Sequence, residues 1–414
     1  MKAVLRMLVI MLAAGVLPAS ATPMGDADAR HLLNRAGFGA RPADIAEFAR
    51  LSRREAVEKL LVVTPIEAGV PVPAEINTYY PPQSLRALSP EARKETLKRS
   101  AIALRVWWID TLLNARTPAG QLRERMTLFW HNHFVSSLQK VKSARLMLDQ
   151  NLLLRRYALG NFGELLHVVG KDPAMVVYLD SATNRRGSPN ENFAREVMEL
   201  FTLGEGNYSE QDIKEAARAF TGWSIERATG EFRWRPFAHD GGSKTVLGVS
   251  GTLDGDAVLD ILLAQPQTAE FVVHKLWREF VSLRPDETGI RRIARRFRDS
   301  GYDTAVALRE IFNSQEFWDG QNRLALIKSP VDWVIGGMNS LDVAPPVSMR
   351  LAFVLRKLGQ DLFAPPNVRG WPGGEAWINS STLLARKQFA EQLLRREGRM
   401  DMHEAMLDPE WQLK

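Results

Sequence analysis

Helical periodicity runs through most of this 414-residue chain and constrains its fold more than any other feature. Apolar residues recur three and four positions apart, which places them on one face of an α-helix. Short joins between several of these segments favour antiparallel neighbours. We therefore predict a mainly α fold, a large helical bundle in a single domain. The clearest helical segments are residues 91–115, 121–134, 144–159, 191–203, 209–220, 268–281, 304–312 and 382–396.

Four segments rich in turn residues interrupt the helices. Residues 64–90 contain six prolines and predict a long ordered loop or a strap across the bundle. Residues 180–190 form a turn-rich loop that leads into the helix at 191–203. Residues 222–252 carry strand-like pieces at 231–235 and 245–247 around a glycine turn, which predicts a small β-hairpin insertion. The fourth interruption is residues 364–377. No tandem repeat and no strongly polar linker divides residues 22–414.

The first 21 residues have the features of a secretory signal peptide. Lys2 and Arg6 precede an apolar run at residues 7–17, and Ala19-Ser20-Ala21 supplies a small-residue cleavage site. The run is shorter than the roughly 20 residues of a membrane-spanning helix, and no later segment reaches that length. We therefore expect cleavage after Ala21 and a mature protein that is periplasmic or secreted.

Composition narrows the chemistry that the mature chain can use. The chain has no cysteine, which excludes disulfides, thiolate catalysis and thiolate metal sites. Loss of the signal peptide lowers the formal net charge from +6 to +4, because that segment has two cations and no acid. The arginine-rich run at residues 291–298 carries Ile293 and Phe297 one helical turn apart, as a solvated helix face does. We therefore expect no nucleic-acid partner.

The segment at residues 190–203 is the strongest indication of function. At 100° per residue, Asn192, Glu196 and Glu199 lie on one edge of the helix, beside its apolar stripe. A carboxylate half withdrawn from water must pair with a cation, accept hydrogen bonds, bind a metal or take up a proton. A structural alternative is open, because Arg195 lies one turn from both Glu191 and Glu199 and could pair with them, and other arginines could neutralise Glu196.

His131 and His133 form the second candidate group. Two helical residues separated by two positions point about 200° apart, so this pair cannot share a metal ion within one helix. His133 lies on the apolar face, whereas His131 shares its side with Glu124. An inward histidine is either a core residue bonded to a carbonyl or a ligand, and His133 with Glu196 and Glu199 would suit zinc or iron.

A third candidate is the loop His239-Asp240-Gly241-Gly242-Ser243-Lys244. Adjacent histidine and aspartate side chains in a glycine-bearing loop can face a ligand together with exposed backbone N–H groups. The alternative is a hairpin turn with His239 at its edge. The loop lacks the GxxxxGK[ST] pattern of a phosphate loop.

Tryptophans in loops are a further candidate for ligand contact. Trp223, Trp234, Trp371 and Trp377 lie between glycines and prolines, where an indole is harder to bury and can line a groove. Arg369, close to the last two, suits either an anionic substrate or a structural ion pair.

Eight blocks in order along the chain carry a resemblance to a known family. They include HLLNRAGFGARPADI at residues 31–45, RMTLFWHNHFVSS at 125–137 and TAEFVVHKLWREFV at 268–281. The other blocks are residues 160–180, 190–203, 216–223, 239–248 and 370–372. Together they resemble the bacterial family catalogued as domain of unknown function 1800, over nearly all of the mature chain. The resemblance implies an exported protein, with a sulfatase-like exported protein as the candidate partner, and it transfers neither an activity nor catalytic residues.

Two hypotheses follow for function. The first is a hydrolase of an envelope or extracellular polymer that works by metal-assisted or acid/base catalysis, with a divalent metal as the candidate cofactor. In it, Glu196 and Glu199 are metal ligands or general bases, His133 and His239 are ligands or acids with Asp240 beside them, and Asn192, Lys244, Arg369 and Trp371 bind substrate. The second is a non-enzymatic helical scaffold or binding protein whose polar motifs are buried ion pairs. Convergence of the predicted side chains on one cavity would favour the enzyme.

Overall fold

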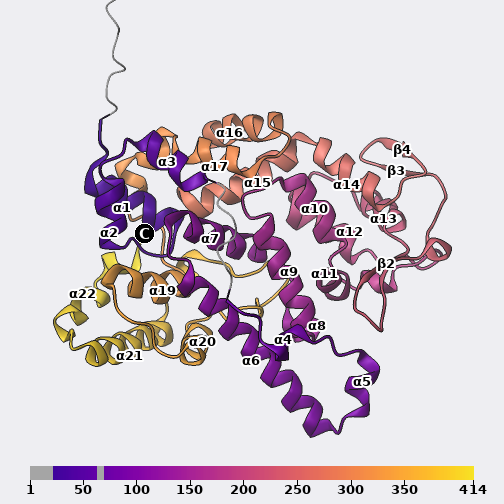
Figure 1. Cartoon of the computed structure of the whole chain (residues 1–414). Helices are drawn as coiled ribbons and strands as arrows, with labels where there is room; N and C mark the ends of the chain where they lie inside the picture. The colour runs from indigo at the N-terminus through magenta and orange to yellow at the C-terminus, as the bar shows by residue number, and fades with distance from the viewer. Residues whose placement is uncertain (1–21, 63–69) are drawn as a thin grey trace, which may run out of the picture.

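The computed structural model describes residues 22–62 and 70–414. The predicted signal peptide at residues 1–21 lies outside the described residues, as does the part of the proline-rich segment at residues 63–69. Within the described ranges the chain is mainly α-helical, as predicted, and its strands form two small antiparallel sheets (Figure 1). None of the described helices is long and apolar enough to cross a membrane.

The elements follow one another in this order. The first part holds α1 (Gly25–Ala36), α2 (Pro42–Phe48), α3 (Arg53–Leu61), α4 (Ala74–Asn77), α5 (Pro82–Ala87), α6 (Pro90–Asn114), α7 (Pro118–His133), α8 (Leu138–Val141) and α9 (Ala144–Arg156). Next come α10 (Phe162–Gly170), α11 (Pro173–Tyr178), η1 (Ser181–Thr183), α12 (Asn192–Glu196), the π-helical turn η2 (Val197–Thr202) and α13 (Glu210–Ala219). The strands are β1 (Trp223–Ile225), β2 (Phe232–Trp234), β3 (Lys244–Val246) and β4 (Val249–Gly251), with η3 (Pro236–Ala238) between β2 and β3.

The remaining elements complete the helical array. They are α14 (Gly255–Ala264), α15 (Pro266–Phe280), α16 (Glu287–Asp299), α17 (Thr304–Phe312), α18 (Gln315–Trp318) and η4 (Gly320–Asn322). The last part holds α19 (Pro330–Leu341), α20 (Ser348–Lys357), η5 (Gly374–Trp377), α21 (Ser380–Glu397), η6 (Met400–Met402), α22 (His403–Leu407) and η7 (Pro409–Gln412).

Local signals set many helix ends close to their predicted positions. Ser209 and Asp212 form a reciprocal capping box at the start of α13. Proline occupies the first turn of α6, α7, α15 and α19, where its missing N–H has no helical partner to lose. Gly204, with a φ of +79°, follows the helical segment that contains α12 and η2, in the left-handed conformation that ends many helices.

Buried hydrophobic side chains form two clusters, and α7 contributes to both. Met126 and Trp130 belong to the cluster among α1, α3, α10 and α12–α17. Leu128, on another side of α7, belongs to the cluster among α6, α19, α20 and α21. Helix α7 therefore lies between the two clusters, near the middle of the molecule (Figure 1). The single-domain assignment of residues 22–414 stays a prediction.

The described part of the proline-rich segment runs as a strap over α6 and α9. Its short helix α4 contacts both, and Ile76 is fully buried there. The guanidinium of Arg145 on α9 donates to the carbonyl of Asn77 at 2.9 Å. Prolines at each helix start allow only the short helices α4 and α5. The strap interpretation is right for residues 70–77, whereas α5 buries none of its residues.

The predicted β insertion is present, but its pairing differs from the prediction. The two strand-like pieces do not pair with each other: β2 pairs with β1, and β3 pairs with β4. The reason lies in the turns. Leu247 and Gly248, with φ of +47° and +81°, make a two-residue turn that closes β3 on β4. Gly230, with a φ of +80°, lies between β1 and β2.

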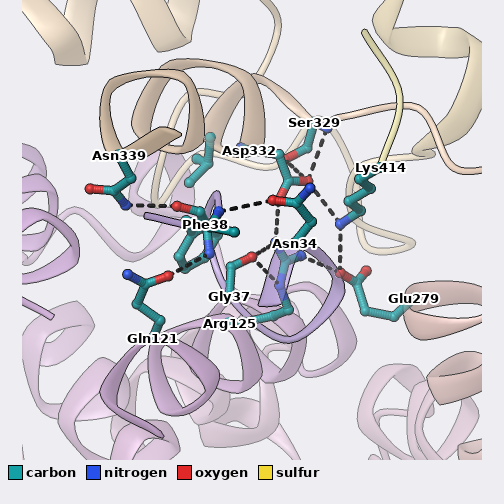
Figure 2. Close-up of polar contacts among 12 residues, drawn as sticks. Asn34, Gly37, Phe38, Gln121, Arg125, Glu279, Ser329, Asp332, Asn339 and Lys414 are labelled. Atoms are coloured by element: carbon teal, nitrogen blue, oxygen red, sulfur yellow. Dashed lines mark hydrogen bonds and ion pairs between the residues drawn. The ribbon is translucent and has the colours of Figure 1, made fainter. Parts of the chain in front are cut away.

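The turn between α1 and α2, with the sequence Gly-Phe-Gly, lies between α7 and α19 (Figure 2). The backbone N–H of Phe38 donates to Oε1 of Gln121 on α7 at 3.0 Å. Its carbonyl accepts from Nδ2 of Asn339 on α19 at 2.6 Å. Gly39 has a φ of +76°, and a Cβ there would overlap the carbonyl of Gly336. The close approach of the two backbones thus needs glycine.

A buried ionic network centred on Arg125 of α7 joins this turn to α15 and α19 (Figure 2). The guanidinium donates to the Gly37 carbonyl at 3.0 Å, bonds Glu279 at 2.7 Å and pairs with Asp332. The ammonium of Lys414 lies 2.9 Å from Asp332 and 3.4 Å from Glu279. Burial alone would raise the pKa of Asp332, but the two cations hold it well below its usual range. The network is therefore two cations paired with two carboxylates.

We expect Gly39→Ala to lower the free energy of unfolding by about 3 kcal/mol or more, because it adds a backbone clash to left-handed strain. Gly25 is the matched control: it has the same φ of +76° and nothing within 4 Å of a built Cβ. Gly25→Ala should cost only about 1 kcal/mol. Urea unfolding of both variants measures the difference. Equal costs would contradict the assigned contact with Gly336.

We expect Arg125→Met to destabilise the fold by about 3–5 kcal/mol, because it leaves buried carboxylates with one cation fewer. Arg54, an exposed arginine of α3, serves as the control, and Arg54→Met should change stability by less than about 0.5 kcal/mol. Chemical denaturation followed by circular dichroism measures both. A cost below about 1 kcal/mol for Arg125→Met would mean that the network contributes little.

Candidate functional site

A cavity of about 300 Å³, here called the central pocket, opens between α7, α15, the start of α19 and the loop at residues 364–377. This volume is at the lower end of the range for ligand sites. Its lining includes Phe129, Asn132 and His133 of α7, Lys275, Arg278 and Glu279 of α15, Arg369, Trp371 and Trp377 of the loop segment, and Asp332 and Lys414 of the ionic network. One wall of the pocket is therefore the network of Figure 2.

Lys275 supplies the amine of the central pocket. Its Nζ donates to the carbonyl of Leu200 at 2.8 Å and lies 3.2 Å from Nδ1 of His133. No carboxylate forms an ion pair with it in the described part of the chain. Burial, and to a smaller extent the neighbouring Arg278 cation, lowers the pKa of Lys275 to about 7. The amine is thus poised between its charged and neutral forms near neutral pH.

His133 is held as one neutral tautomer. Its Nε2 lies 3.1 Å from the carbonyl of Phe201, which can only accept, so Nε2 carries the hydrogen. Nδ1 is then an acceptor and faces the amine of Lys275. Burial, followed by the Lys275 charge, holds the pKa of His133 well below its usual range. The structural interpretation of this histidine is right, and its second nitrogen reaches the central pocket.

The two acceptors around Lys275 determine what its amine can do. A neutral amine has two hydrogens and one lone pair. The Leu200 carbonyl and Nδ1 of His133 take the two hydrogens, which leaves the lone pair for a group in the pocket. When the amine is protonated, the third hydrogen occupies that position instead. Lys275 can therefore take a proton from a bound group or donate one to it.

The π-helical turn η2 supplies both carbonyls. The N–H of Leu203 bonds the Met198 carbonyl at 2.8 Å, five residues back, and the N–H of Gly204 bonds the same carbonyl at 3.1 Å. The helix ends there, so the carbonyls of Leu200 and Phe201 have no partner within it. They bond Lys275 and His133 instead. π-Helical turns are frequent at functional sites for this kind of reason.

Asn132 fixes the tryptophan loop against the central pocket. Its Oδ1 accepts from the backbone N–H of Trp371 at 2.7 Å, and its Nδ2 donates to the carbonyl of Trp371 at 3.3 Å. Gly370 has a φ of +81°, and a Cβ there would overlap the Asn132 side chain. Trp371 and Trp377 both line the pocket, whereas Trp223 is buried in the core and Trp234 lies half-exposed on β2.

The predicted carboxylates lie beside the central pocket and do not line it. Glu199 accepts from Arg369 at 2.8 Å and from the Tyr208 hydroxyl at 3.0 Å. It therefore positions Arg369, which does line the pocket. Arg195 pairs with Glu191, as the structural alternative supposed, and with Glu210, but it does not pair with Glu199.

Two other predicted residues of this segment also lie outside the central pocket. Burial, followed by repulsion from Glu199, raises the pKa of Glu196. Asn192 donates to Oδ2 of Asp180 at 3.3 Å on the exposed surface. Their catalytic and substrate-binding roles stay predictions without a cavity contact.

The loop at residues 239–244 is a structural turn distant from the central pocket. Arg218 donates to Asp240 at 2.8 Å, and this bond is the main reason that the pKa of Asp240 falls to about 2. Nδ1 of His239 lies 2.9 Å from the Thr221 carbonyl. Lys244 donates to the carbonyl of Asp240 at 2.5 Å, inside its own loop. None of the three predicted residues lines the pocket, because the β3–β4 insertion holds them elsewhere.

The predicted metal site of His133, Glu196 and Glu199 is not assembled. Within residues 22–62 and 70–414, no three His, Asp or Glu side chains are grouped so that they could hold a metal ion. Both nitrogens of His133 are engaged, one of them with the Lys275 amine, and Glu199 is engaged with Arg369. The predicted side chains do not converge on one cavity, so together they do not form one active site.

His131 differs from its expected position. It was expected on the polar side of α7 with Glu124, yet both are buried. Helix α7 lies between two hydrophobic clusters, so opposite faces of it are inward. Glu124 is neutralised by Arg155, with an N–O distance of 2.5 Å, and His131 packs edge-on against Trp108. The two histidines do point apart, as predicted.

Lys275 and Arg278 are site residues that the sequence analysis missed. A lysine on a helix is normally a solvated cation. The only local indication is that Lys275 lies one position before the buried Leu276 and three after the buried Val272, at the edge of the apolar face. The burial of its amine comes from α7 and η2, far away in sequence.

We expect Lys275→Met to change the pH dependence of stability. The folded state lowers the lysine pKa, so between about pH 7 and 10.5 the unfolded chain binds more protons, and wild-type stability should rise with pH there. The variant lacks this contribution, so its stability relative to wild type should be highest at or below pH 7 and decline toward pH 10. Urea unfolding at several pH values tests this. A constant difference would contradict the assigned pKa.

The comparisons with known proteins agree with the family resemblance that the eight sequence blocks carry. No curated protein and no solved structure matches the chain. The family described as protein of unknown function (DUF1800) matches residues 31–412, a range that contains all the elements around the central pocket. Since this match covers nearly the whole sequence, the chain belongs to the DUF1800 family.

Proposed function

We propose that this chain is an exported enzyme that hydrolyses an envelope or extracellular polymer by acid/base catalysis in the central pocket. The observation that carries the proposal is the environment of Lys275 Nζ. Two acceptors hold the amine, no carboxylate among residues 22–62 and 70–414 pairs with it, and burial brings its pKa to about 7. A general base works best when its pKa lies near the pH at which it operates.

In the proposed reaction, the neutral amine of Lys275 removes a proton from a water molecule as that water attacks the scissile bond. The resulting ammonium is stabilised by the Leu200 carbonyl and Nδ1 of His133. It then returns the proton to the leaving group, which restores the neutral amine. His133 acts here as a positioning residue, because its fixed tautomer keeps Nδ1 available as an acceptor.

The size of the central pocket limits how a polymer could enter it. A cavity of about 300 Å³ holds roughly one sugar-sized unit, so the proposed enzyme would act on the terminal unit of the polymer. Trp371 and Trp377 give part of the lining an aromatic surface, while Asn132 and Gln360 add polar groups. A lining of this mixed kind suits a polar ring compound.

A second candidate is a binding protein or scaffold that partners another exported protein, a sulfatase-like one by family resemblance. The observation that favours it is that two of the three predicted acids have an arginine partner: Glu199 has Arg369, and Asp240 has Arg218. Such pairs fix a fold without chemistry. In this alternative, Lys275 has no catalytic use.

The two candidates are separated by incubating the chain without residues 1–21 with purified envelope polysaccharides and peptidoglycan, and measuring released fragments by mass spectrometry. We expect wild type to release products at a rate that rises with pH through about 7, as more amine becomes neutral. Lys275→Met should lower this rate about 100-fold or more, the usual contribution of a general base.

Lys357 provides the matched control, because this exposed lysine of α20 bonds only the Gln388 side chain. Lys357→Met should leave the rate unchanged. Full activity in folded Lys275→Met would contradict the assignment of the base. An absence of products from every polymer with wild type would contradict the enzyme and favour the binding protein.

A further inference from the structure

The charges that line the central pocket do not balance. Its two acids, Glu279 and Asp332, are both engaged by Arg125 and Lys414. That group of four is formally neutral. Of the other cations of the lining, Lys275 and Arg278 on α15 have no carboxylate partner among the described residues, whereas Arg369 of the loop at residues 364–377 pairs with Glu199 and Glu205 outside the lining.

Arg278 is the clearest of these excess cations. It is exposed, lines the pocket, and makes no hydrogen bond or ion pair with any part of the chain that the structure describes. It lies one helical turn after Lys275, so both side chains lie on the same side of α15. The guanidinium is close enough to Lys275 to disfavour the ammonium. A ligand with negative charge would neutralise this repulsion.

Arg369 is the third of these cations in the lining of the pocket. A single nitrogen, Nη2, bonds both Glu199 and Glu205 at 2.8 Å. Its remaining guanidinium N–H groups make no hydrogen bond with the described residues. Nη2 belongs to both edges through which a guanidinium binds a carboxylate bidentately, so the N–H groups left on Nε and Nη1 can each donate only single hydrogen bonds to a ligand. The two acids fix the side chain, and Arg369 offers a ligand single N–H donors.

We infer that the central pocket binds an acidic sugar, with the carboxylate held by Arg278 and the ring beside Trp371 and Trp377. The charge of the site selects the anion, and the mixed aromatic and polar lining selects a ring that carries hydroxyl groups. This names the substrate class for the proposed enzyme and rests on that proposal for its catalytic use. Binding itself requires no reaction.

The test is isothermal titration of the wild-type chain with D-glucuronate and, separately, with D-glucose, which has the same ring without the carboxylate. We expect glucuronate to bind and glucose to bind at least tenfold more weakly. Arg278→Gln should weaken glucuronate binding about tenfold or more, the usual effect of removing a charge-assisted hydrogen bond. Arg278 makes no hydrogen bond or ion pair with the described residues, so this variant should fold like wild type.

The matched control is Arg291→Gln, which removes an exposed arginine of α16 outside the pocket. It changes the net charge equally and should leave affinity unchanged. Equal weakening by both variants, or equal binding of glucose and glucuronate, would overturn the inference. Binding of inorganic phosphate with no binding of glucuronate would also overturn it, since the site would then recognise a tetrahedral anion. All these results are independent of whether Lys275 catalyses hydrolysis.

Discussion

The rest of this structure depends on the hydrogen bond and ion pairs that the buried guanidinium of Arg125 makes. It bonds the Gly37 carbonyl of the first turn, Glu279 of α15 and Asp332 of α19, so it joins segments that are far apart in the sequence. Buried charges are costly unless each has its partners in place, so this arrangement tolerates few alternatives. The same residues form a wall of the central pocket, which makes the geometry of the pocket a consequence of the fold's most constrained contacts.

Much of the fold could be predicted because its signals are local. Caps such as Ser209 and first-turn prolines fixed helix ends, and periodicity identified the helices themselves. The π-helical turn could not be predicted in this way. Its apolar spacing continues the preceding helix, and its freed carbonyls are stabilised by Lys275 and His133 from other helices. The pairing of the strands was likewise decided by turn residues, such as Leu247 and Gly248, rather than by the strand pieces.

The segment that the sequence predicted for the site adjoins the central pocket, but through other atoms than expected. The helix with Glu196 and Glu199 does adjoin the pocket, yet it contributes backbone carbonyls, and Glu199 acts through Arg369. A sequence pattern indicates which side chains a segment presents, but not which of its backbone groups lack a helical partner. The role of these carbonyls therefore could not be predicted. The loop with His239 and Asp240 had the right residue types for chemistry, but only the tertiary structure shows that its groups are engaged locally.

A comparison of two buried cations argues that Lys275 has more than a structural role. Arg35 also lacks an acid partner in the described part of the chain, and burial lowers its pKa to about 9, but it donates to three backbone carbonyls and lines no part of the central pocket. Its guanidinium satisfies backbone carbonyls at the C-terminal end of α15, and this structural role explains why a buried arginine is there. Among the described residues, the Lys275 amine makes two hydrogen bonds, and the residue lines a cavity into which its third position can point. A methionine would fill the same space without the cost of burying an amine, so packing alone does not explain a lysine there.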